Sequence, residues 1–359
     1  MKSVLLLGAT GSIGTTFLTA LRNHPELDIR IAGMTASSNK ALEQLGREFN
    51  APYFYLQGAD CSKLKAIIDE TKPDIILNAI AGTDGLTASA EALNSGLDLA
   101  LANKESIVLG GHFLLDKARD NNARIIPVDS EHSAIYHLLK GKKAERLIIT
   151  ASGGPFRTRE NLEDVTIQEA LNHPTWKMGK KITIDSATLA NKGLEVIEAS
   201  LLFGFPPEKI DVTVHPQSII HSMIETAEGA VYALMSPPDM TLPILTAIIE
   251  EGSGMKDIVK PLSFSSGLSL TFSPWDRKRF PMLEYAYEAL RQGAGYRIAY
   301  ASADETAVNA FLNGRIGFID IARITKEVLS SDYPASEPDT LEEILEIRKD
   351  AERKAEALC

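Results

Sequence analysis

The chain has 359 residues, of which 44% are hydrophobic and 24% are charged. A single hydrophobic core rarely grows past about 250 to 300 residues, so this length predicts two or three domains, and the composition excludes disordered and fibrous classes. Lysine and arginine number 37 against 48 acidic residues, and the net charge of -11 argues against nucleic acids and anionic membranes as partners.

The chain lacks an uninterrupted apolar run of about 18 residues, so we expect no membrane-spanning helix. Its short apolar start is interrupted by glycine and threonine, which argues against a signal peptide. The two cysteines, Cys61 in a polar loop and Cys359 at the end, make no disulfide framework. These features together predict a reducing, cytoplasmic setting.

Short β-rich runs alternate with amphipathic helical stretches over the first part of the chain. The predicted strands are residues 4–7, 29–34, 75–78, 97–101 and 124–128. Such alternation is typical of a parallel, doubly wound sheet of the Rossmann type, with helices on both faces.

A second pattern follows and predicts an α+β domain. Its expected strands are residues 147–151, 182–184, 210–214, 219–224 and 231–234. A proline-rich stretch with one short helix at 242–250 then reads as a connecting arm. The rest is helical, with helices expected at 282–291, 304–312, 320–329 and 341–357, the last opened by the capping pair Thr340 and Glu343.

A glycine-rich turn, Gly8-Ala9-Thr10-Gly11-Ser12-Ile13-Gly14, joins the first predicted strand to a helix. Glycines there let backbone amides approach a pyrophosphate at the positive end of the helix. The glycine spacing differs by one residue from the usual dinucleotide fingerprint, and a plain tight turn is the alternative. Its place between the first strand and the first helix favours dinucleotide binding.

The end of the second predicted strand indicates which dinucleotide is bound. An NAD site places an acidic residue there, but Asp28 lies at the entry end of this strand. The exit carries Ser37, Ser38, Asn39 and Lys40, which suit a 2′-phosphate and favour NADP. The same residues also suit the start of the next helix.

Carboxylates gather in two later stretches. Asp129 and Glu131 follow the strand at 124–128, and two residues apart in an extended segment they would point the same way. Glu195 ends the polar stretch 185–195, which we expect to lead from a strand into a helix. Three carboxylates favour magnesium or manganese over zinc. The alternative is that Asp129 and Glu131 only cap the helix at 132–139.

Two further polar stretches have compositions typical of ligand sites. Residues 152–157, Ser-Gly-Gly-Pro-Phe-Arg, offer backbone amides and a hydroxyl to an anion, or form an ordinary glycine turn. Residues 173–179 place Trp176 between proline and glycine breakers, as in a lid over a site, although a buried tryptophan that anchors a loop would look the same. The histidines His173, His215 and His221 also fit a core or loop role.

A competing motif occurs at Tyr136 and Lys140, whose spacing is that of the catalytic pair of short-chain dehydrogenases. Two residue identities at this spacing arise easily by chance. The pair also lies directly after the carboxylates, on a helix with an apolar face. We therefore keep a short-chain NADP dehydrogenase, and a non-catalytic NADP-binding protein, as alternatives.

Taken together, these motifs resemble the 1-deoxy-D-xylulose 5-phosphate reductoisomerase family over nearly the whole chain. The resemblance is carried by the glycine turn and six further stretches, at 102–106, 128–132, 152–157, 173–179, 185–195 and 215–218. The chain departs from the family at Ser37-Ser38-Asn39, where glycine, then lysine or serine, then asparagine is common. It also has Ala301-Ser302-Ala303-Asp304-Glu305 in place of Asn-Ala-Ala-Asn-Glu, a change expected to affect packing or assembly.

The resemblance implies a role for each matching residue. The catalytic and cation-binding set is Lys104 with the metal ligands Asp129, Glu131 and Glu195. The substrate-binding set is Lys104, Ser130, Glu131, Ser152, His173, Trp176, Ser186, Asn191, Lys192 and Glu195. The NADPH-binding set is Thr10, Gly11, Ser12, Ile13, Ser37, Ser38, Asn39, Asn103, Glu105 and Gly179.

The resemblance further implies the activity and organisation. The chain is expected to isomerise and reduce 1-deoxy-D-xylulose 5-phosphate to 2-C-methyl-D-erythritol 4-phosphate in non-mevalonate isoprenoid biosynthesis, with NADPH and Mg²⁺ or Mn²⁺, as a cytoplasmic homodimer. The expected parts are an NADPH-binding domain at 1–149, a catalytic domain at 150–235 with a flap at 173–179, a connecting arm at 236–275 and a helical domain at 276–359.

Overall fold

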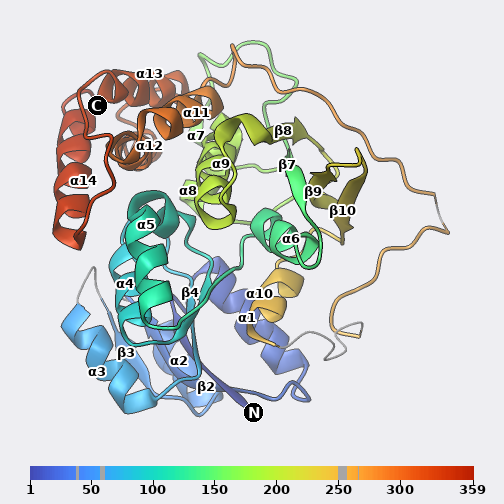
Figure 1. The fold of residues 1–359 in the computed structure, drawn as a ribbon, viewed down its shortest axis with the longest axis vertical. Coiled ribbons are helices and arrows are strands. Elements are labelled where there is room, and N and C mark those ends of the chain that lie inside the picture. The colour runs from blue at the N-terminus through green and yellow to red at the C-terminus, as the bar shows by residue number, and fades with distance from the viewer. Residues whose placement is uncertain (38–39, 57–60, 250–256, 266) are drawn as a thin grey trace. The chain divides into compact units, whose positions relative to one another are not determined.

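The computed structural model describes residues 1–37, 40–56, 61–249, 257–265 and 267–359, and its internal contacts divide the chain into two units (Figure 1). The first unit comprises Met1–Ser106, Leu114–Ser133 and Asp239–Leu262. The second comprises Ile107–Phe113, Ala134–Pro238 and Ser263–Cys359. The expected division into four parts remains a prediction.

The first unit contains a six-stranded parallel sheet of strand order β3-β2-β1-β4-β5-β6. Its strands are β1 (Lys2–Leu7), β2 (Ile29–Ala36), β3 (Tyr53–Tyr55), β4 (Ile75–Asn78), β5 (Asp98–Leu101) and β6 (Ile125–Pro127). The predicted doubly wound sheet is therefore confirmed. The strand order reverses between β1 and β4, which is the position where such sheets bind dinucleotides.

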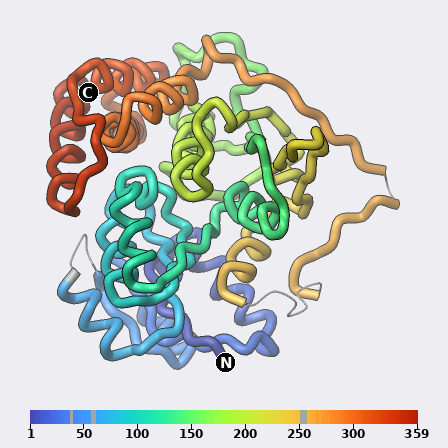
Figure 2. Tube along the Cα trace, viewed as in Figure 1, coloured from blue at the N-terminus to red at the C-terminus, as the bar shows by residue number. Residues whose placement is uncertain are grey.

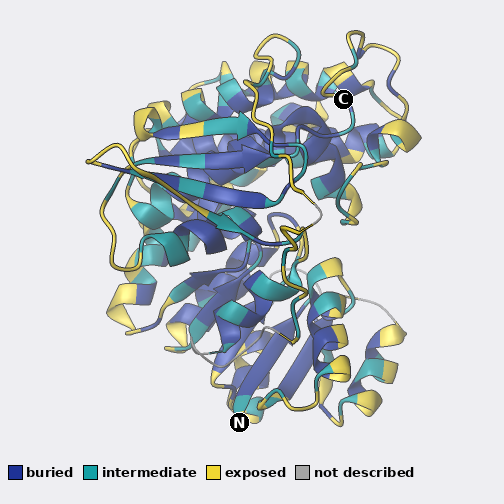
Figure 3. Cartoon of the chain, turned by 90° about the vertical axis from the view of Figure 1, so that its right-hand side faces the viewer, coloured by how far each residue is buried: buried dark blue, intermediate teal, exposed yellow. Residues whose placement is uncertain are grey.

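Helices connect these strands, namely α1 (Ser12–Asn23), α2 (Ala41–Glu48), α3 (Cys61–Thr71), α4 (Gly85–Asn94) and α5 (Lys104–Asp120). Right-handed crossovers place helices on both faces, so the central strands are buried on both sides and consist of almost unbroken apolar runs. Figure 3 shows these strands in the buried colour. Cys61, expected in a polar loop, is the first residue of α3.

The chain returns to the first unit at α10 (Thr241–Ile248). This helix packs on α1 and beside β5 and β6, and its side chains Ile244, Leu245 and Ile248 are buried. The predicted short helix in the arm is thus confirmed. From residue 257 to residue 275, the described residues form no helix or strand apart from one isolated bridge between Ser273 and Val214 (Figure 2).

The second unit contains a four-stranded mixed sheet of order β10-β9-β7-β8. Its strands are β7 (Ala144–Ala151), β8 (Ile210–Val214), β9 (Ile220–Thr226) and β10 (Val231–Met235). Strand β7 is parallel to β8 and antiparallel to β9. The preceding helix is α6 (Ser130–Leu138), and the helices between β7 and β8 are α7 (Ile167–Ala170), α8 (Lys180–Thr188), α9 (Ala190–Phe203) and the 3₁₀ turn η1 (Pro207–Lys209).

The predicted strand at 182–184 is wrong, because those residues lie inside α8. Alternating Ile182, Thr183 and Ile184 suggested a strand, since β-branched residues are enriched there. In the structure, the backbone N–H and the hydroxyl of Thr183 both donate to the carbonyl of Gly179, at 3.1 and 2.7 Å. These bonds close the first helical turn, and burial of the next turn outweighs the local β preference.

The C-terminal helices are α11 (Met282–Gln292), α12 (Ala294–Leu312), α13 (Phe318–Leu329) and α14 (Leu341–Glu356), and the predicted helical region is confirmed. Thr340 caps α14 by accepting from the backbone N–H of Glu343 at 3.2 Å. Helix α12 begins earlier than expected. Gly295 lies inside this helix, and a Cβ there would come 2.6 Å from the carbonyl oxygen of Pro334.

Helix α5 is interrupted by a kink at Gly111, whose φ is +44°. A Cβ at Gly111 would come 2.1 Å from the guanidinium of Arg297, a buried side chain of α12. Arg297 donates to the carbonyl of Val108 at 3.2 Å and pairs with Glu337. No described helix is long and apolar enough to span a membrane.

Candidate active site

The glycine turn after β1 packs directly against the end of β4. Gly8 has a φ of +83°, and a Cβ there would lie 2.5 Å from the carbonyl oxygen of Ala79. A Cβ at Gly14 would lie 2.5 Å from the carbonyl oxygen of Gly8. Only glycine fits either position, so the turn lies close to the end of the sheet. This leaves the backbone amides at the start of α1 available to an anion.

The predicted NADPH-binding residues of this turn, Thr10, Gly11, Ser12 and Ile13, surround the start of α1. Gly11 is the N-cap residue of the helix and makes no side-chain cap, and the first turn contains no acidic residue. The helix N-terminus therefore keeps its partial positive charge, which favours a phosphate group.

The end of β2 adjoins the same turn. The carbonyl of Thr35 accepts from the backbone N–H groups of Gly8 and Ala9, at 3.1 and 2.8 Å. Ser37 follows β2 and is exposed, as expected for a residue beside a 2′-phosphate, whereas the predicted contacts Ser38 and Asn39 lie outside the described residues. Asp28 lies at the opposite end of β2, paired with the N-terminal amine.

Asn103 is a cap and a cross-link at the start of α5. Its Oδ1 accepts from the backbone N–H of Ser106 at 2.9 Å, and its Nδ2 donates to the carbonyls of Ile80 and Gly82 at 2.9 and 2.7 Å. Glu105 accepts from the same amide nitrogen at 3.2 Å. Asn103 thus holds the loop after β4 against α5, at the switch point of the sheet. A direct NADPH contact by Asn103 or Glu105 remains a prediction.

Lys104 and Asp129 form a buried ion pair at the carboxyl ends of the strands. The distance between Lys104 Nζ and Asp129 Oδ2 is 2.6 Å. Lys104 opens α5 after β5, and Asp129 follows β6, so both lie where ligands of parallel sheets bind.

The expected extended segment at Asp129 and Glu131 is wrong, because α6 already begins at Ser130. The backbone N–H of Glu131 donates to Asp129 Oδ1 at 3.2 Å, which is a helix-start turn of the kind the capping alternative described. Ser130 Oγ donates to Glu131 Oε2 at 2.5 Å. Carboxylate oxygens at this place are suitable ligands for a cation such as Mg²⁺.

In the second unit, the predicted anion nest follows β7 at Ser152. Gly153 and Gly154 both have positive φ, at +82° and +65°. A Cβ at Gly154 would come 2.7 Å from the carbonyl oxygen of Ser186, so the glycine allows the nest to pack against the end of α8. The structure therefore brings Ser152 and Ser186 into the same neighbourhood.

His173 is held in one orientation by three contacts. Its Nδ1 accepts from the backbone N–H groups of Thr175 and Trp176, at 3.1 and 2.8 Å. Its Nε2 therefore carries the proton and donates to Ser152 Oγ, 3.0 Å away. Burial, followed by the charge of Lys192, lowers the pKa of His173 to about 4. The neutral ring orients the Ser152 hydroxyl, which can then donate its own proton to a ligand.

The stretch 185–195 is two helices joined at Leu189, whose φ is +63°, and not the strand and helix expected. Ser186 lies on α8, and the other predicted site residues lie on α9. Asn191 Nδ2 donates to Glu195 Oε1 at 2.5 Å, and Lys192 Nζ contacts Glu195 Oε2 at 2.6 Å. Both oxygens of this buried carboxylate are thus in polar contact, and Lys192 stabilises its charge.

The predicted flap, residues 173–179, contains no helix or strand among its residues, all of which the structure describes. The ring of Trp176 lies 6.3 Å from the ring of His221, measured between centroids, and is only half-buried. Gly179 ends the segment as the N-cap residue of α8. The roles of Trp176 and Gly179 toward substrate and NADPH remain predictions.

Tyr136 and Lys140 do not make the contact that short-chain catalysis needs. Lys140 Nζ lies 4.7 Å above the centre of the Tyr136 ring, so the ammonium contacts the face of the ring. In the short-chain arrangement, a lysine acts on the tyrosine hydroxyl to lower its pKa. Lys140 is also exposed. The structure therefore does not favour the short-chain alternative.

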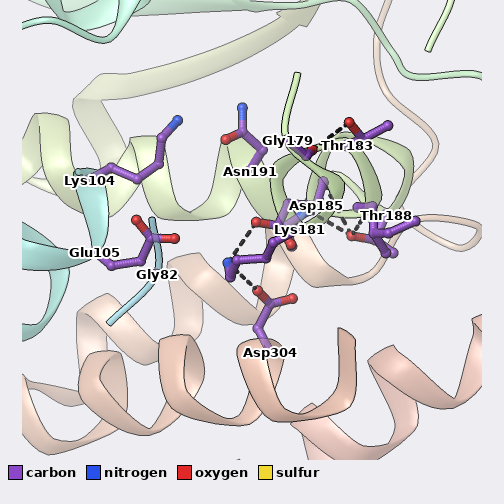
Figure 4. A network of polar contacts seen from close by, with 12 residues as sticks. Gly82, Lys104, Glu105, Gly179, Lys181, Thr183, Asp185, Thr188, Asn191 and Asp304 are labelled. Carbon is purple, nitrogen blue, oxygen red and sulfur yellow. Dashed lines mark hydrogen bonds and ion pairs between the residues drawn. The ribbon is translucent and has the colours of Figure 1, made fainter. Parts of the chain in front are cut away.

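Sequence reasoning did not single out Lys181, and it named Asp304 only within the departure from the family at 301–305. Lys181 Nζ contacts Asp185 Oδ2 at 2.7 Å and Asp304 Oδ2 at 3.2 Å, and both carboxylates are buried (Figure 4). Lys181 and Asp185 are spaced one helical turn apart, so their spacing in the sequence could have indicated this ion pair. Asp304 lies 123 residues from Lys181, and no local pattern connects them.

The fold and these residues define a class: an α/β protein with a dinucleotide-binding sheet and a second unit that carries a polar, carboxylate-containing site. Family models of 1-deoxy-D-xylulose 5-phosphate reductoisomerase match residues 4–63 and 55–111. Models of its C-terminal domains match residues 125–203 and 235–354.

Relatives of full length carry the same name. A 1-deoxy-D-xylulose 5-phosphate reductoisomerase of Treponema denticola is 48% identical over 100% of this chain and 96% of its own length. One from Treponema pallidum is 42% identical over 96% of this chain and 94% of its own length.

Solved structures of reductoisomerases are also similar to this chain. A reductoisomerase in complex with NADPH, fosmidomycin and magnesium has a TM-score of 0.86 and 33% identity, covering 100% of this chain and 98% of its own. The Zymomonas mobilis enzyme in complex with NADPH has a TM-score of 0.83 and 36% identity, covering 99% and 98%. The chain belongs to the 1-deoxy-D-xylulose 5-phosphate reductoisomerase family.

Proposed function

We propose that the chain isomerises and reduces 1-deoxy-D-xylulose 5-phosphate to 2-C-methyl-D-erythritol 4-phosphate, with NADPH and a divalent cation, in isoprenoid biosynthesis. The observation that carries this proposal is full-length identity of 48% with a relative of that name. Solved relatives contain NADPH, magnesium and fosmidomycin, which supports the cofactors and a small phosphorylated substrate.

Asp129, Glu131 and Glu195 are the proposed ligands of the cation. An all-oxygen set of this kind fits Mg²⁺ or Mn²⁺. Lysines contact two of the carboxylates at 2.6 Å, Lys104 at Asp129 and Lys192 at Glu195. When bound, the cation supplies Lewis-acid stabilisation of negative charge on the substrate oxygens. Lys104 adds a positive charge beside the same oxygens.

The proposed NADPH site follows the glycine turn. The amides at the start of α1, with Thr10, Gly11, Ser12 and Ile13, would hold the pyrophosphate, and Ser37, Ser38 and Asn39 the 2′-phosphate. Asn103 would fix the loop after β4, and Glu105 and Gly179 would line the rest of the site. NADPH supplies the hydride that reduces the aldehyde formed by isomerisation.

The substrate phosphate would be bound in the second unit. Its proposed contacts are Ser152, His173, Ser186, Asn191 and Lys192, and Ser130 of the first unit is a further proposed contact of the substrate. His173 donates to Ser152, so the hydroxyl proton of Ser152 is free to reach a phosphate oxygen. Binding energy from this non-reacting group can orient the reacting carbons.

Trp176 would cover the bound substrate as part of a flap. The segment 173–179 has irregular backbone, and its tryptophan is partly exposed, which suits closure on a ligand. Closure excludes water from the reacting centre. A cytoplasmic homodimer is also proposed, from the cysteine usage and from the resemblance alone.

The test is NADPH oxidation, followed at its absorbance band, with 1-deoxy-D-xylulose 5-phosphate and Mg²⁺ present. We expect oxidation that depends on both additions and forms 2-C-methyl-D-erythritol 4-phosphate. Tight NADPH binding without oxidation would support a non-catalytic NADP-binding protein instead.

A further inference from the structure

Helix α8 connects two parts of the proposed site. Its N-cap is Gly179, the last residue of the flap, and its final turns carry Ser186. The two bonds from Thr183 to the Gly179 carbonyl tie the end of the flap to the first turn of this helix. Whatever fixes the first turn of α8 therefore also fixes the point from which the flap extends.

Lys181 lies in that first turn, between two aspartates. Its ammonium contacts Asp185 one turn along the same helix, at 2.7 Å, and Asp304 on α12, at 3.2 Å. Asp185 and Asp304 are 1% and 0% exposed, and the Lys181 side chain is 15% exposed. Buried carboxylates need a partner charge, and removal of one partner from such a group is strongly unfavourable.

Helix α12 contacts α9 as well, through a residue one turn before Asp304. Tyr300 donates to the carbonyls of Met282 and Ala190, at 3.2 and 3.4 Å. A Cβ at Gly193 would lie 2.4 Å from its hydroxyl, so the ring packs tightly on α9. Burial raises the pKa of Tyr300 well above its usual value, so the hydroxyl remains a donor. One face of α12 thus contacts both α8 and α9, the helices that carry the predicted substrate residues of the stretch 185–195.

We propose that Lys181, held between Asp185 and Asp304, is a positioning residue that fixes α8 on α12 and thereby sets the closed position of the 173–179 flap. This inference deepens the proposed function and rests on it. Lys181 acts through α8 and Gly179, so its loss should weaken substrate binding more than it slows turnover. NADPH affinity should change less than substrate affinity, because Gly179 is the only predicted NADPH contact next to α8 and the glycine turn lies in the other unit.

The first experiment compares Lys181→Met with Lys180→Met, the exposed neighbouring lysine, as the matched control. We expect Lys181→Met to raise the KM for 1-deoxy-D-xylulose 5-phosphate about tenfold, with kcat and NADPH affinity each lowered less than about threefold. Lys181→Arg should restore most of the affinity. Equal KM values for the two methionine variants would overturn the proposal, as would a loss of kcat and NADPH affinity together.

The second experiment reads the flap without turnover. The chain has two tryptophans, so Trp275→Phe leaves Trp176 as the single reporter. Fosmidomycin with Mg²⁺ and NADPH should change Trp176 emission, and Lys181→Met should raise the fosmidomycin concentration at half change about tenfold. An unaltered titration in Lys181→Met would contradict the proposal.

Asp304→Asn gives a milder variant that preserves shape and can still accept a hydrogen bond. We expect a KM increase of about threefold, and no further increase when it is combined with Lys181→Met, because residues of one network are non-additive. A folded Asp304→Asn protein with unchanged KM, or additive effects, would overturn the proposal. Wild-type protein that fails to oxidise NADPH would instead contradict the proposed function. The Trp176 titration would still test whether Lys181 positions the flap.

Discussion

The ammonium of Lys104 lies 2.6 Å from Asp129 Oδ2, and both side chains are largely buried, at 5% and 12% exposed. The two residues begin their separate segments at the carboxyl ends of neighbouring strands, β5 and β6. Each charge therefore stabilises the other in a place where neither is well hydrated. A substitution at either residue affects the proposed chemistry and the folded state together.

Asp129→Asn should lower turnover at least about a hundredfold and leave NADPH affinity nearly unchanged, because this carboxylate serves the cation and not the dinucleotide. It should also lower the free energy of unfolding by about 3 kcal/mol, since Lys104 then stays buried without its carboxylate. Steady-state kinetics and urea unfolding measure the two effects. Asp116→Asn, at an exposed position on α5, is the control. Wild-type turnover in Asp129→Asn would refute the assignment.

Removal of divalent cations should abolish turnover reversibly. Chelator-stripped protein is expected to bind NADPH but to form no product, and Mg²⁺ or Mn²⁺ should restore activity. Glu195→Gln should be restored poorly, with turnover at least about a hundredfold below wild type at saturating cation. Full product formation in stripped buffer would contradict the carboxylate assignment.

Trp176→Ala should raise the KM for 1-deoxy-D-xylulose 5-phosphate and lower kcat about tenfold or more, because the flap loses the ring that covers the substrate. NADPH oxidation at varied substrate concentration gives both constants. Trp275→Ala, at the other tryptophan, should leave both near wild type. If the two variants behave alike, Trp176 is not part of a lid.

Acidification should destabilise the protein through His173. Its pKa is 6.5 ordinarily and about 4 in the folded chain, so between these values the unfolded chain binds a proton that the folded chain does not. The stabilising contribution is therefore present above about pH 6.5 and is lost as pH falls toward 4. Urea unfolding at pH 7.5 and pH 5 should show wild type losing stability relative to His173→Gln. A difference that stays constant over this interval would argue against a neutral His173.

Tyr136→Phe should retain near-normal turnover. The hydroxyl has no part in the proposed reaction, and the lysine one turn on contacts the ring face, which phenylalanine preserves. The same NADPH oxidation assay decides this. A loss of turnover of about a thousandfold would instead support the short-chain mechanism.

The parallel sheet was predictable because its central strands are buried on both faces and are therefore continuous apolar runs. Strand β3 was missed, since its three residues, Tyr53–Tyr55, lie at the sheet edge and carry little pattern. Helix α8 was mistaken for a strand because its β-branched residues follow a local preference that tertiary packing overrides.

The candidate residues were found because they cluster in short motifs, at glycine turns and strand ends, where local sequence carries chemistry. The geometry among them was less accessible. Nothing in the sequence indicated that the two nitrogens of His173 would be used in opposite ways, or that Lys181 would meet Asp304. Such contacts depend on how distant helices pack, which a single sequence does not encode in any short pattern.

Helix α10 gives the first unit an unusual order of assembly during translation. Its apolar side chains complete the packing beside α1, β5 and β6, yet they are synthesised after every strand of the second sheet. The nascent first unit therefore keeps an apolar face uncovered until α10 is synthesised, after the strands of the second sheet. A polypeptide cut after Met235 would keep its parallel sheet but expose that face, so we expect it to aggregate or to recruit chaperones.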